Sequence, residues 1–291
     1  MQRIKSLSEY FNQYEKSQSD PEGFWAEIAK SFSWIEPWKK VLESDFEKAD
    51  VKWFIDGKLN ITENIFERNL IENKDKTAII WEPNNPDEDT KKISYQELYE
   101  ETCKFSNALK DLGIKKGDRI IIYMPMVPEA AIAMLACARV GAVHSVVFAG
   151  FSSTSLADRI DDCESKMVIT SDGNFRGNKV IPVKSVVDEA LEKSNSIEKV
   201  IVLKRTNQEV NFVSGRDFWW HELVKDKSSE CKAEVMDSED MLFVLYTSGS
   251  TGKPKGVVHT TGGYMVYSAY TFLNVFQYDK DDIYWCTADV G

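Results

Sequence analysis

Short apolar runs alternate with stretches of helical spacing between residues 77 and 289. Predicted strands are TAIIW (77–81), DRIIIYM (118–124), HSVVFAGF (144–151), KMVITSD (166–172), IEKVIVLK (197–204), MLFVLYT (241–247) and DDIYWCTAD (281–289). Helical patterns lie between several of these runs: one begins at the SYQE capping box at Ser94, one follows Pro128 and one covers 152–165. This order predicts an α/β fold with a mostly parallel sheet flanked by helices, and such sheets bind ligands beyond the carboxyl ends of their strands.

Residues 1–66 differ from the rest, because they are rich in aromatic and charged residues. Asp20 and Pro21 have the residue types of an N-cap and a first helical position, and Trp25, Ile28 and related positions continue the helical spacing. We therefore predict a helical N-terminal extension over 1–66 and a main domain over 67–291. The segment NNPDEDTKK (84–92) is typical of a solvated surface loop.

Composition narrows the function classes. The net charge of −11 argues against a nucleic-acid binder and against attachment to an anionic membrane. The five cysteines are odd in number and widely spaced, which favours a reducing compartment over disulfides or a zinc site. The N-terminus lacks an apolar signal core, and no run approaches the roughly 20 apolar residues of a membrane span. We expect a soluble, cytoplasmic protein.

The segment YTSGSTGKPKGVVHTTGGY (246–264) carries the candidate chemistry. Residues 246–263 hold five glycines and six Ser or Thr residues, with Lys253 and Lys255 among them. Glycine lets a backbone approach an anion closely, and amides, hydroxyls and lysine can bind phosphate. The spacing is not that of a Walker A loop, because two residues separate Gly249 from Gly252 and Pro254 follows the lysine.

Residues 241–278 contain no Asp or Glu, although the chain's average acid content would place about six in a segment of that length. One explanation is a local field suited to an anion. The other is burial, which also excludes acids.

The same segment resembles the phosphate-loop signature of the adenylate-forming acyl-CoA synthetases. Further stretches narrow the resemblance to the acetyl-coenzyme A synthetases: DPEGFWAEIAKSFSWIEPWKKVLESDF, WFIDGKLNITENIFERNL, GDRIIIYMPMVPEAAIAMLACARVGAVHSVVFAGFS and YWCTADVG. The resemblance covers nearly the whole chain. It implies that 1–66 is the extension typical of that family and that 67–291 is the first part of an AMP-binding domain.

The resemblance also implies two sets of site residues. The loop that holds the β- and γ-phosphates of ATP corresponds to Thr247, Ser248, Gly249, Ser250, Thr251, Gly252 and Lys253. The coenzyme A site corresponds to Phe148, Gly150, Arg176, Gly177, Asn178 and Lys179. Arg176 matches an arginine that contacts the 3′-phosphate-bearing ADP end of coenzyme A, and Lys179 stands where a second arginine is common. From the residues alone, an exposed basic turn at 176–179 and a core role for Phe148 remain alternatives.

The implied reaction converts acetate, ATP and coenzyme A into acetyl-CoA, AMP and pyrophosphate, with Mg²⁺ accompanying ATP. The family's enzymes are more than twice as long, so we expect this chain to be an N-terminal part that lacks the magnesium-binding motif, the ribose-binding aspartate and the C-terminal domain with its catalytic lysine. We assign it no catalytic residue and no metal ligand, and we expect it to be inactive alone and dependent on the missing C-terminal portion. A ligase for propionate or another short-chain acid, or a non-catalytic nucleotide- or CoA-binding protein, remains possible.

Three further residues attract weaker hypotheses. His259 is predicted to be a packed loop residue rather than a general base. Cys286 is predicted to be an inert buried thiol, because it falls in a predicted strand. Asp289 belongs to the TADVG motif, which lies at the active-site edge in the family.

Overall fold

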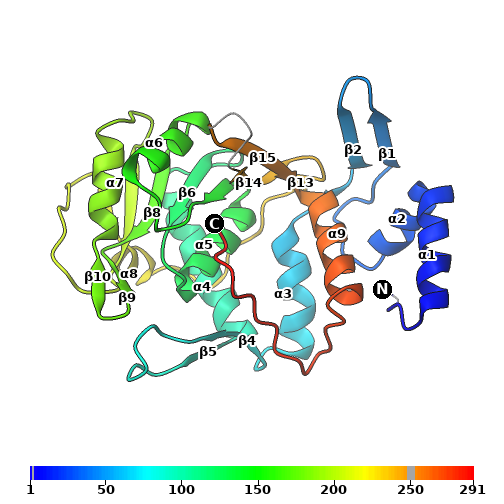
Figure 1. Ribbon diagram of the computed structural model, residues 1–291, viewed down its shortest axis with the longest axis horizontal. Coiled ribbons are helices and arrows are strands. Elements are labelled where there is room, and N and C mark those ends of the chain that lie inside the picture. The colour runs from blue at the N-terminus through cyan, green and yellow to red at the C-terminus, as the bar shows by residue number, and fades with distance from the viewer. Residues whose placement is uncertain (2, 248–252) are drawn as a thin grey trace. The chain divides into compact units, whose positions relative to one another are not determined.

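A computed structural model describes residues 1, 3–247 and 253–291 (Figure 1). The chain forms two compact units, each built from several segments. The first unit comprises Met1–Asn64, Val235–Met241 and His259–Ala288. The second unit comprises Ile65–Glu234, Leu242–Val258 and Asp289–Gly291.

The helices of the described residues are α1 (Leu7–Ser19), α2 (Pro21–Ala29), α3 (Ile61–Glu72), α4 (Tyr95–Asp111), α5 (Pro128–Val140), α6 (Ser153–Asp162), α7 (Val183–Leu191), α8 (Trp220–Val224) and α9 (Thr261–Asn274). The strands are β1 (Lys40–Asp45), β2 (Asp50–Ile55), β3 (Lys58–Leu59), β4 (Thr77–Trp81), β5 (Lys91–Ser94), β6 (Arg119–Tyr123), β7 (Val143–Val146), β8 (Met167–Ser171), β9 (Asn174–Arg176), β10 (Lys179–Ile181), β11 (Lys199–Leu203), β12 (Asp217–Trp219), β13 (Met236–Asp237), β14 (Met241–Thr247) and β15 (Lys255–Thr260).

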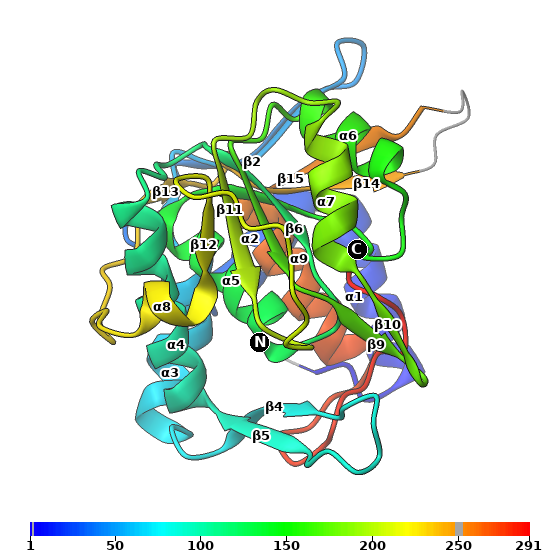
Figure 2. The same cartoon turned by 90° about the vertical axis from the view of Figure 1, so that its left-hand side faces the viewer.

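A seven-stranded sheet in the order β12-β11-β8-β6-β7-β14-β15 organises the second unit. The ladders that join β12 through to β14 are all parallel. Alternate residues of β6 enter different apolar clusters: Ile120 and Ile122 lie in the cluster with α4 and α5, and Ile121 lies in the cluster with α6 and α7. Helices therefore cover both faces of the sheet (Figure 2). The predicted fold class is confirmed.

Local signals in the sequence explain where several helices begin. The Ser94 side chain accepts a hydrogen bond from the Glu97 amide, and the Glu97 carboxylate accepts one from the Ser94 amide, so the predicted capping box opens α4. Asp20 caps α2, whose first residue is Pro21, as predicted. Gly141 ends α5 with a φ of 74°, a conformation that glycine adopts without strain.

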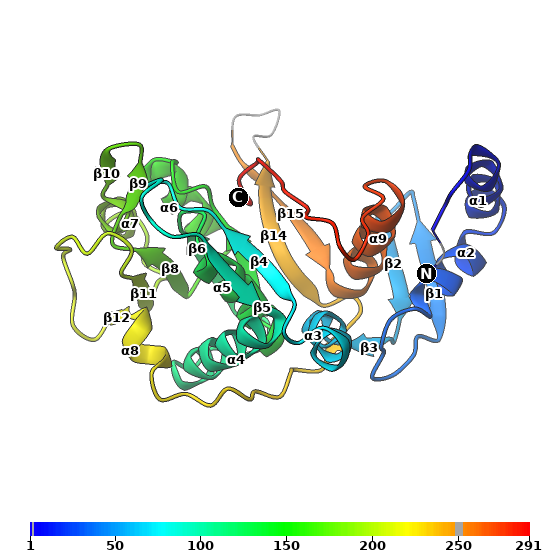
Figure 3. The same ribbon diagram turned by 90° about the horizontal axis from the view of Figure 1, so that it is seen from below.

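Two predicted strands differ from the structure. The strand expected over 144–151 ends at Val146, and FAGF forms the loop that follows. The segment expected to be a strand over 281–289 has no regular secondary structure (Figure 3). Its Trp285 side chain is 82% exposed. A strand requires a hydrogen-bonded neighbour, and none of the described strands pairs with these residues.

The first unit is not purely helical, in contrast to the extension predicted for residues 1–66. Strands β1 and β2 form an antiparallel hairpin within it. Its core is rich in aromatic side chains, and Trp25, for example, lies 5.6 Å from Tyr270 of α9 in an edge-to-face contact.

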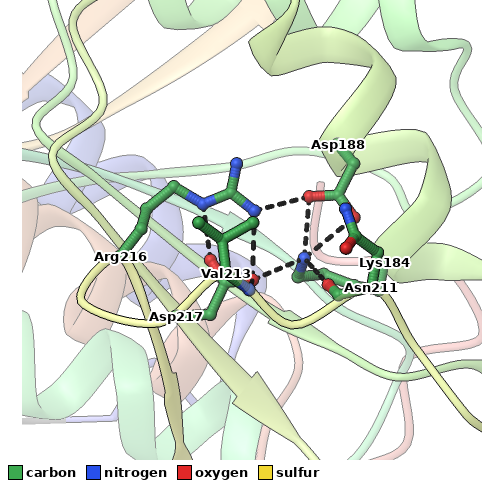
Figure 4. Close-up of polar contacts among 6 residues, drawn as sticks. All are labelled: Lys184, Asp188, Asn211, Val213, Arg216 and Asp217. Carbon is green, nitrogen blue, oxygen red and sulfur yellow. Dashed lines mark hydrogen bonds and ion pairs between the residues drawn. The ribbon is translucent and has the colours of Figure 1, made fainter.

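A buried ion network ties α7 to the connection between β11 and β12 (Figure 4). The ammonium group of Lys184 lies 2.7 Å from Asp188 and 2.9 Å from Asp217, and the Asn211 carbonyl accepts a further hydrogen bond from it. Arg216 donates to both aspartates. Each buried charge therefore has an opposite charge in contact, as burial of ions requires.

Candidate functional site

The strand order defines where a ligand would bind in the second unit. Strands β7-β6-β8-β11-β12 follow the doubly wound order in which the chain first adds β7 on one side of β6 and then β8 on the other. The helices that follow β6 and β8 therefore leave the sheet on opposite faces, α5 on one and α7 on the other. Ligands of such sheets bind beyond the carboxyl ends of the strands at this switch point.

The predicted coenzyme A segment lies at that edge, directly after β8. Arg176 ends β9, Lys179 begins β10, and the two are paired across the hairpin, so both cationic side chains lie on the same face. Gly177 and Asn178 form the two-residue turn, in which Gly177 supplies a positive φ of 56°. All four residues are exposed.

The FAGF loop follows β7 at the same edge. Phe148 is 40% exposed, which is inconsistent with a plain core role, and its ring lies edge-to-face on Phe151. A Cβ atom on Gly150 would lie 2.3 Å from the Phe148 ring, so the ring occupies the space that the glycine leaves. Tyr123, at the end of β6, donates a hydrogen bond to the Phe151 carbonyl, and burial raises the pKa of Tyr123 to about 12.

The predicted phosphate loop follows β14. Thr247 is the last residue of this strand and is exposed, as is Lys253. The predicted residues Ser248, Gly249, Ser250, Thr251 and Gly252 lie outside the described residues. The described part of this segment therefore places the start of the loop at the carboxyl end of β14, which is parallel to β7.

Two of the five glycines in this segment leave no room for a side chain. A Cβ atom on Gly256 would lie 2.9 Å from the Val244 side chain of the neighbouring strand. One on Gly262 would lie 2.8 Å from Ser238, whereas one on Gly263 would lie 3.6 Å from the Trp53 side chain, which is an ordinary contact distance. The high glycine content of the segment is therefore only partly a sign of phosphate binding.

Burial also explains only part of the acid-free segment. The middle of β14, including Phe243 and Val244, is buried, but Val257 and Val258 of β15 are 42% and 50% exposed. Burial therefore accounts for the absence of acids in the middle of β14 but not at the exposed positions of β15, where the anion explanation stays a prediction.

Arg159 of α6 is a buried cation that sequence reasoning missed. Its guanidinium lies 4.8 Å from the Phe151 ring and 5.4 Å from the Tyr246 ring, and it donates to the Ser155 carbonyl. Burial lowers the pKa of Arg159, and Tyr246 in turn donates to Asp162. This cluster connects the FAGF loop to the strand that precedes the phosphate loop. Its members are distant in sequence, so no local pattern indicates it.

Two of the weaker hypotheses have outcomes in the structure. His259 contacts the Tyr264 ring, and burial lowers the pKa of His259, in keeping with a packed residue, although it lies in strand β15 and not in a loop as predicted. Cys286 is exposed, so the prediction of a buried thiol is wrong, for the same reason that its predicted strand is absent.

The described residues provide neither a metal-ion cluster nor a membrane-spanning helix. Within residues 1, 3–247 and 253–291, no group of three or more His, Cys, Asp or Glu side chains is arranged to hold a metal ion. No described helix combines the length and apolar character needed to cross a bilayer.

Comparisons with known proteins agree with this architecture. A family model described as AMP-binding enzyme matches residues 66–291, and one described as acetyl-coenzyme A synthetase N-terminus matches residues 10–65. The chain is 54% identical over 285 residues to an acetyl-coenzyme A synthetase of Bdellovibrio bacteriovorus, covering 98% of this chain and 44% of that protein. It is 56% identical to one of Syntrophobacter fumaroxidans, covering 97% of this chain and 43% of that protein.

Among solved structures, the acetoacetyl-CoA synthetase from Streptomyces lividans matches with a TM-score of 0.80 and 26% identity, over 89% of this chain and 39% of that one. The chain thus belongs to the AMP-binding enzymes, and within them its relatives are acetyl-coenzyme A synthetases, as the sequence resemblance predicts. It spans about 44% of the length of these relatives, so the prediction that the family's enzymes are more than twice as long is also confirmed.

Proposed function

We propose that this chain forms the ATP- and CoA-binding part of an AMP-forming acetate–CoA ligase. The observation that carries the proposal is the meeting of three predicted site segments at the carboxyl edge of one parallel sheet: the FAGF loop after β7, the Arg176–Lys179 pair after β8 and Thr247 at the end of β14. Relatives that cover 97–98% of the chain and carry the name acetyl-coenzyme A synthetase support the choice of reaction.

The proposed reaction has two steps. A carboxylate oxygen of acetate attacks the α-phosphorus of ATP, and pyrophosphate leaves. The coenzyme A thiol then loses its proton and attacks the acyl carbonyl, and AMP leaves with the electron pair of the broken acyl–phosphate bond. Positioning and charge stabilisation dominate steps of this kind. Thr247, Lys253 and the loop between them are proposed to hold the departing phosphates, with Lys253 as a mobile point charge.

The coenzyme A site is proposed to combine a charged part and an apolar part. Arg176 and Lys179 supply two cations to the phosphorylated ADP end, and a guanidinium can bind phosphate through two parallel hydrogen bonds. Gly177 and Asn178 complete this turn. Phe148 and Gly150 supply an apolar wall for the nucleotide, and the exposed face of Phe148 is available for such a contact.

Mg²⁺ is proposed to accompany ATP, because nucleotide-dependent enzymes use it to neutralise phosphate charge. The described residues contain no cluster of side chains suited to a metal ion, so we assign this chain no ligand to it. The proposal includes a cytoplasmic location, which the five free cysteines favour.

The test uses the whole protein that contains this chain. Pyrophosphate release is measured with ATP, coenzyme A and either acetate, propionate or acetoacetate. We expect acetate to give the highest kcat/KM. A higher kcat/KM with another acid would identify that acid, rather than acetate, as the substrate. No pyrophosphate release with any of the three acids would favour a non-catalytic binding protein.

The isolated 291-residue chain is expected to release no pyrophosphate in the same assay, because it spans less than half the length of its relatives. Acetate- and CoA-dependent release by this chain alone would contradict that expectation.

A further inference from the structure

The β9–β10 hairpin carries the proposed phosphate-binding cations but is small. Each of its strands has three residues, and a two-stranded hairpin of this size has little stability of its own. Arg176 and Lys179 are directly opposite each other, which further destabilises the pairing of the strands. Contacts from outside the hairpin are therefore needed to fix where the two cations lie.

The loop between β4 and β5 supplies the first of these contacts. Asn84 donates to the Gly177 carbonyl and accepts from the Gly177 amide, both at 3.0 Å, so one side chain satisfies both backbone groups of a turn residue. The loop and the hairpin lie side by side in two perpendicular views (Figures 2 and 3). The predicted surface character of residues 84–92 is correct, but the loop is also a structural support.

A second contact comes from Arg205, which follows β11. Its guanidinium forms two parallel hydrogen bonds to Glu88 of the same loop, at 3.0 and 2.8 Å. Two aromatic rings contact the Arg205 guanidinium. The ring centroid of Trp81, the last residue of β4, lies 5.0 Å from it, and that of Phe175 in the hairpin lies 4.9 Å from it. Arg205 therefore joins the loop to the residue that precedes Arg176.

Arg205 is itself held at the end of the sheet. The buried carboxylate of Asp172 accepts hydrogen bonds from the backbone amides of Gly173, Arg205 and Thr206. Trp81 donates to the Met126 carbonyl just after β6. The support therefore spans the ends of β6, β8 and β11, on both sides of the switch point.

We infer that Asn84, Glu88 and Arg205 are positioning residues that set where Arg176 and Lys179 meet the 3′-phosphate at the ADP end of coenzyme A. This inference rests on the proposed function, because it concerns the same ligand. None of the three residues needs to touch the ligand for this role.

The effect of removing the Glu88 charge distinguishes a positioning role from a purely electrostatic one. Glu88 is an anion near a site for an anionic ligand, so its removal would strengthen binding if only long-range charge mattered. Positioning predicts the opposite result, because loss of the bidentate pair frees Arg205 and the hairpin. Asp89, an exposed neighbour on the same loop, offers a control that removes the same charge and leaves the pair to Arg205 in place.

The experiment measures KM in the whole protein for coenzyme A and for 3′-dephospho-coenzyme A, with variants N84A, E88Q, D89N and R176A. We expect N84A and E88Q to raise KM for coenzyme A roughly five- to tenfold, with kcat, the KM for ATP and the KM for the dephospho analogue within about twofold of the parent. D89N is expected to leave every constant within the same range.

Other outcomes separate the inference from the proposed function. A normal KM in N84A and E88Q together with a raised KM in R176A would overturn the inference alone. An unchanged KM for coenzyme A in R176A would overturn the assignment of the hairpin to this ligand, and the inference with it. An equal rise for both ligands, or an equal effect of D89N, would also contradict the positioning role.

Discussion

The ammonium group of Lys184 illustrates how much a single residue away from the site contributes to the fold. Its side chain has no exposed surface and contacts Asp188 and the fully buried Asp217. Substitution K184M would leave two carboxylates sharing one cation, Arg216, so we expect the free energy of unfolding to fall by about 3–5 kcal/mol. Urea denaturation of the isolated chain followed by circular dichroism measures this loss.

Lys193 offers a matched control, because it forms a pair of the same spacing with Glu189 but on the surface. K193M is expected to cost about 1 kcal/mol or less. Equal losses in the two variants would show that burial of the Lys184 network adds nothing.

Residue identity alone could not separate the roles of the glycines at 246–263. Gly256 and Gly262 are required by a neighbouring strand and by Ser238, which are contacts that a sequence does not display. Arg159 was missed for the same reason, since its two aromatic neighbours come from different elements. The cations at 176 and 179, in contrast, were assigned through the family resemblance, because their local pattern of two charges and a glycine is equally that of an exposed basic turn.

The turn of the β9–β10 hairpin requires a positive φ at its first residue, Gly177. Gly177 has a φ of 56° and no atom within 4 Å of a built Cβ, so an alanine there would be strained by its backbone alone. We expect G177A to destabilise the hairpin by about 1 kcal/mol and to raise KM for coenzyme A in the whole protein several-fold. G177N should have a KM for coenzyme A between those of the parent and G177A, because asparagine tolerates a positive φ better than alanine does.

Gly215 provides the control, with a φ of 85° and equally open surroundings. G215A should carry a similar strain and leave KM for coenzyme A unchanged. A change in KM with G215A would mean that general destabilisation, rather than the turn, controls binding.

The capping box of α4 predicts a pH dependence. Hydrogen bonds from the Ser94 amide and hydroxyl lower the pKa of Glu97 below its ordinary 4.5. A carboxyl group whose pKa is lower in the folded state stabilises the fold at pH values above its unfolded-state pKa. This stabilisation is lost as the pH falls through the folded-state pKa. We therefore expect E97Q to have a lower urea midpoint than the parent at pH 6 and a smaller difference towards pH 3. A difference that stays constant across this range would contradict the role of the ionised cap.

At the scale of elements, sequence periodicity identified α4, α5, α6 and the buried parallel strands β6, β8, β11 and β14, but it did not identify α7 or α9. It missed the hairpins β1–β2 and β9–β10, whose strands are short and bury few residues: β1 and β2 have one buried residue each, and β9 and β10 have none. It extended β7 into FAGF because Phe148 is apolar, although that ring is partly exposed in a loop.

At the scale of the molecule, alternation of strands and helices was sufficient to predict the parallel sheet, and the carboxyl edge followed from the strand direction. The strand order was not predictable from one sequence, because the placement of β8 on the far side of β6 depends on contacts between distant segments. The support of the hairpin by the β4–β5 loop depends on such contacts too.

The sheet also predicts how the isolated chain behaves in solution. β15 is the last strand in its order, and Val257 is 42% exposed on it. Exposed apolar edge strands promote association, so we expect the chain to self-associate and V257K to reduce its mean mass in light scattering. L7K, at an exposed leucine of α1, is the control. An equal reduction by L7K would show that general charge, rather than the edge, is responsible.

The two clusters that cover the sheet have a consequence for biosynthesis. Their buried members all lie between Phe66 and Trp220. Both faces of the five sheet strands β6, β7, β8, β11 and β12 can therefore be packed before residues 221–291 are synthesised. Domains fold as units while the ribosome extends the chain. β14 would then add to an existing edge, where Phe243 pairs with His144 of β7. The strand that leads into the proposed phosphate loop thus arrives late, at a sheet whose proposed coenzyme A edge is already formed.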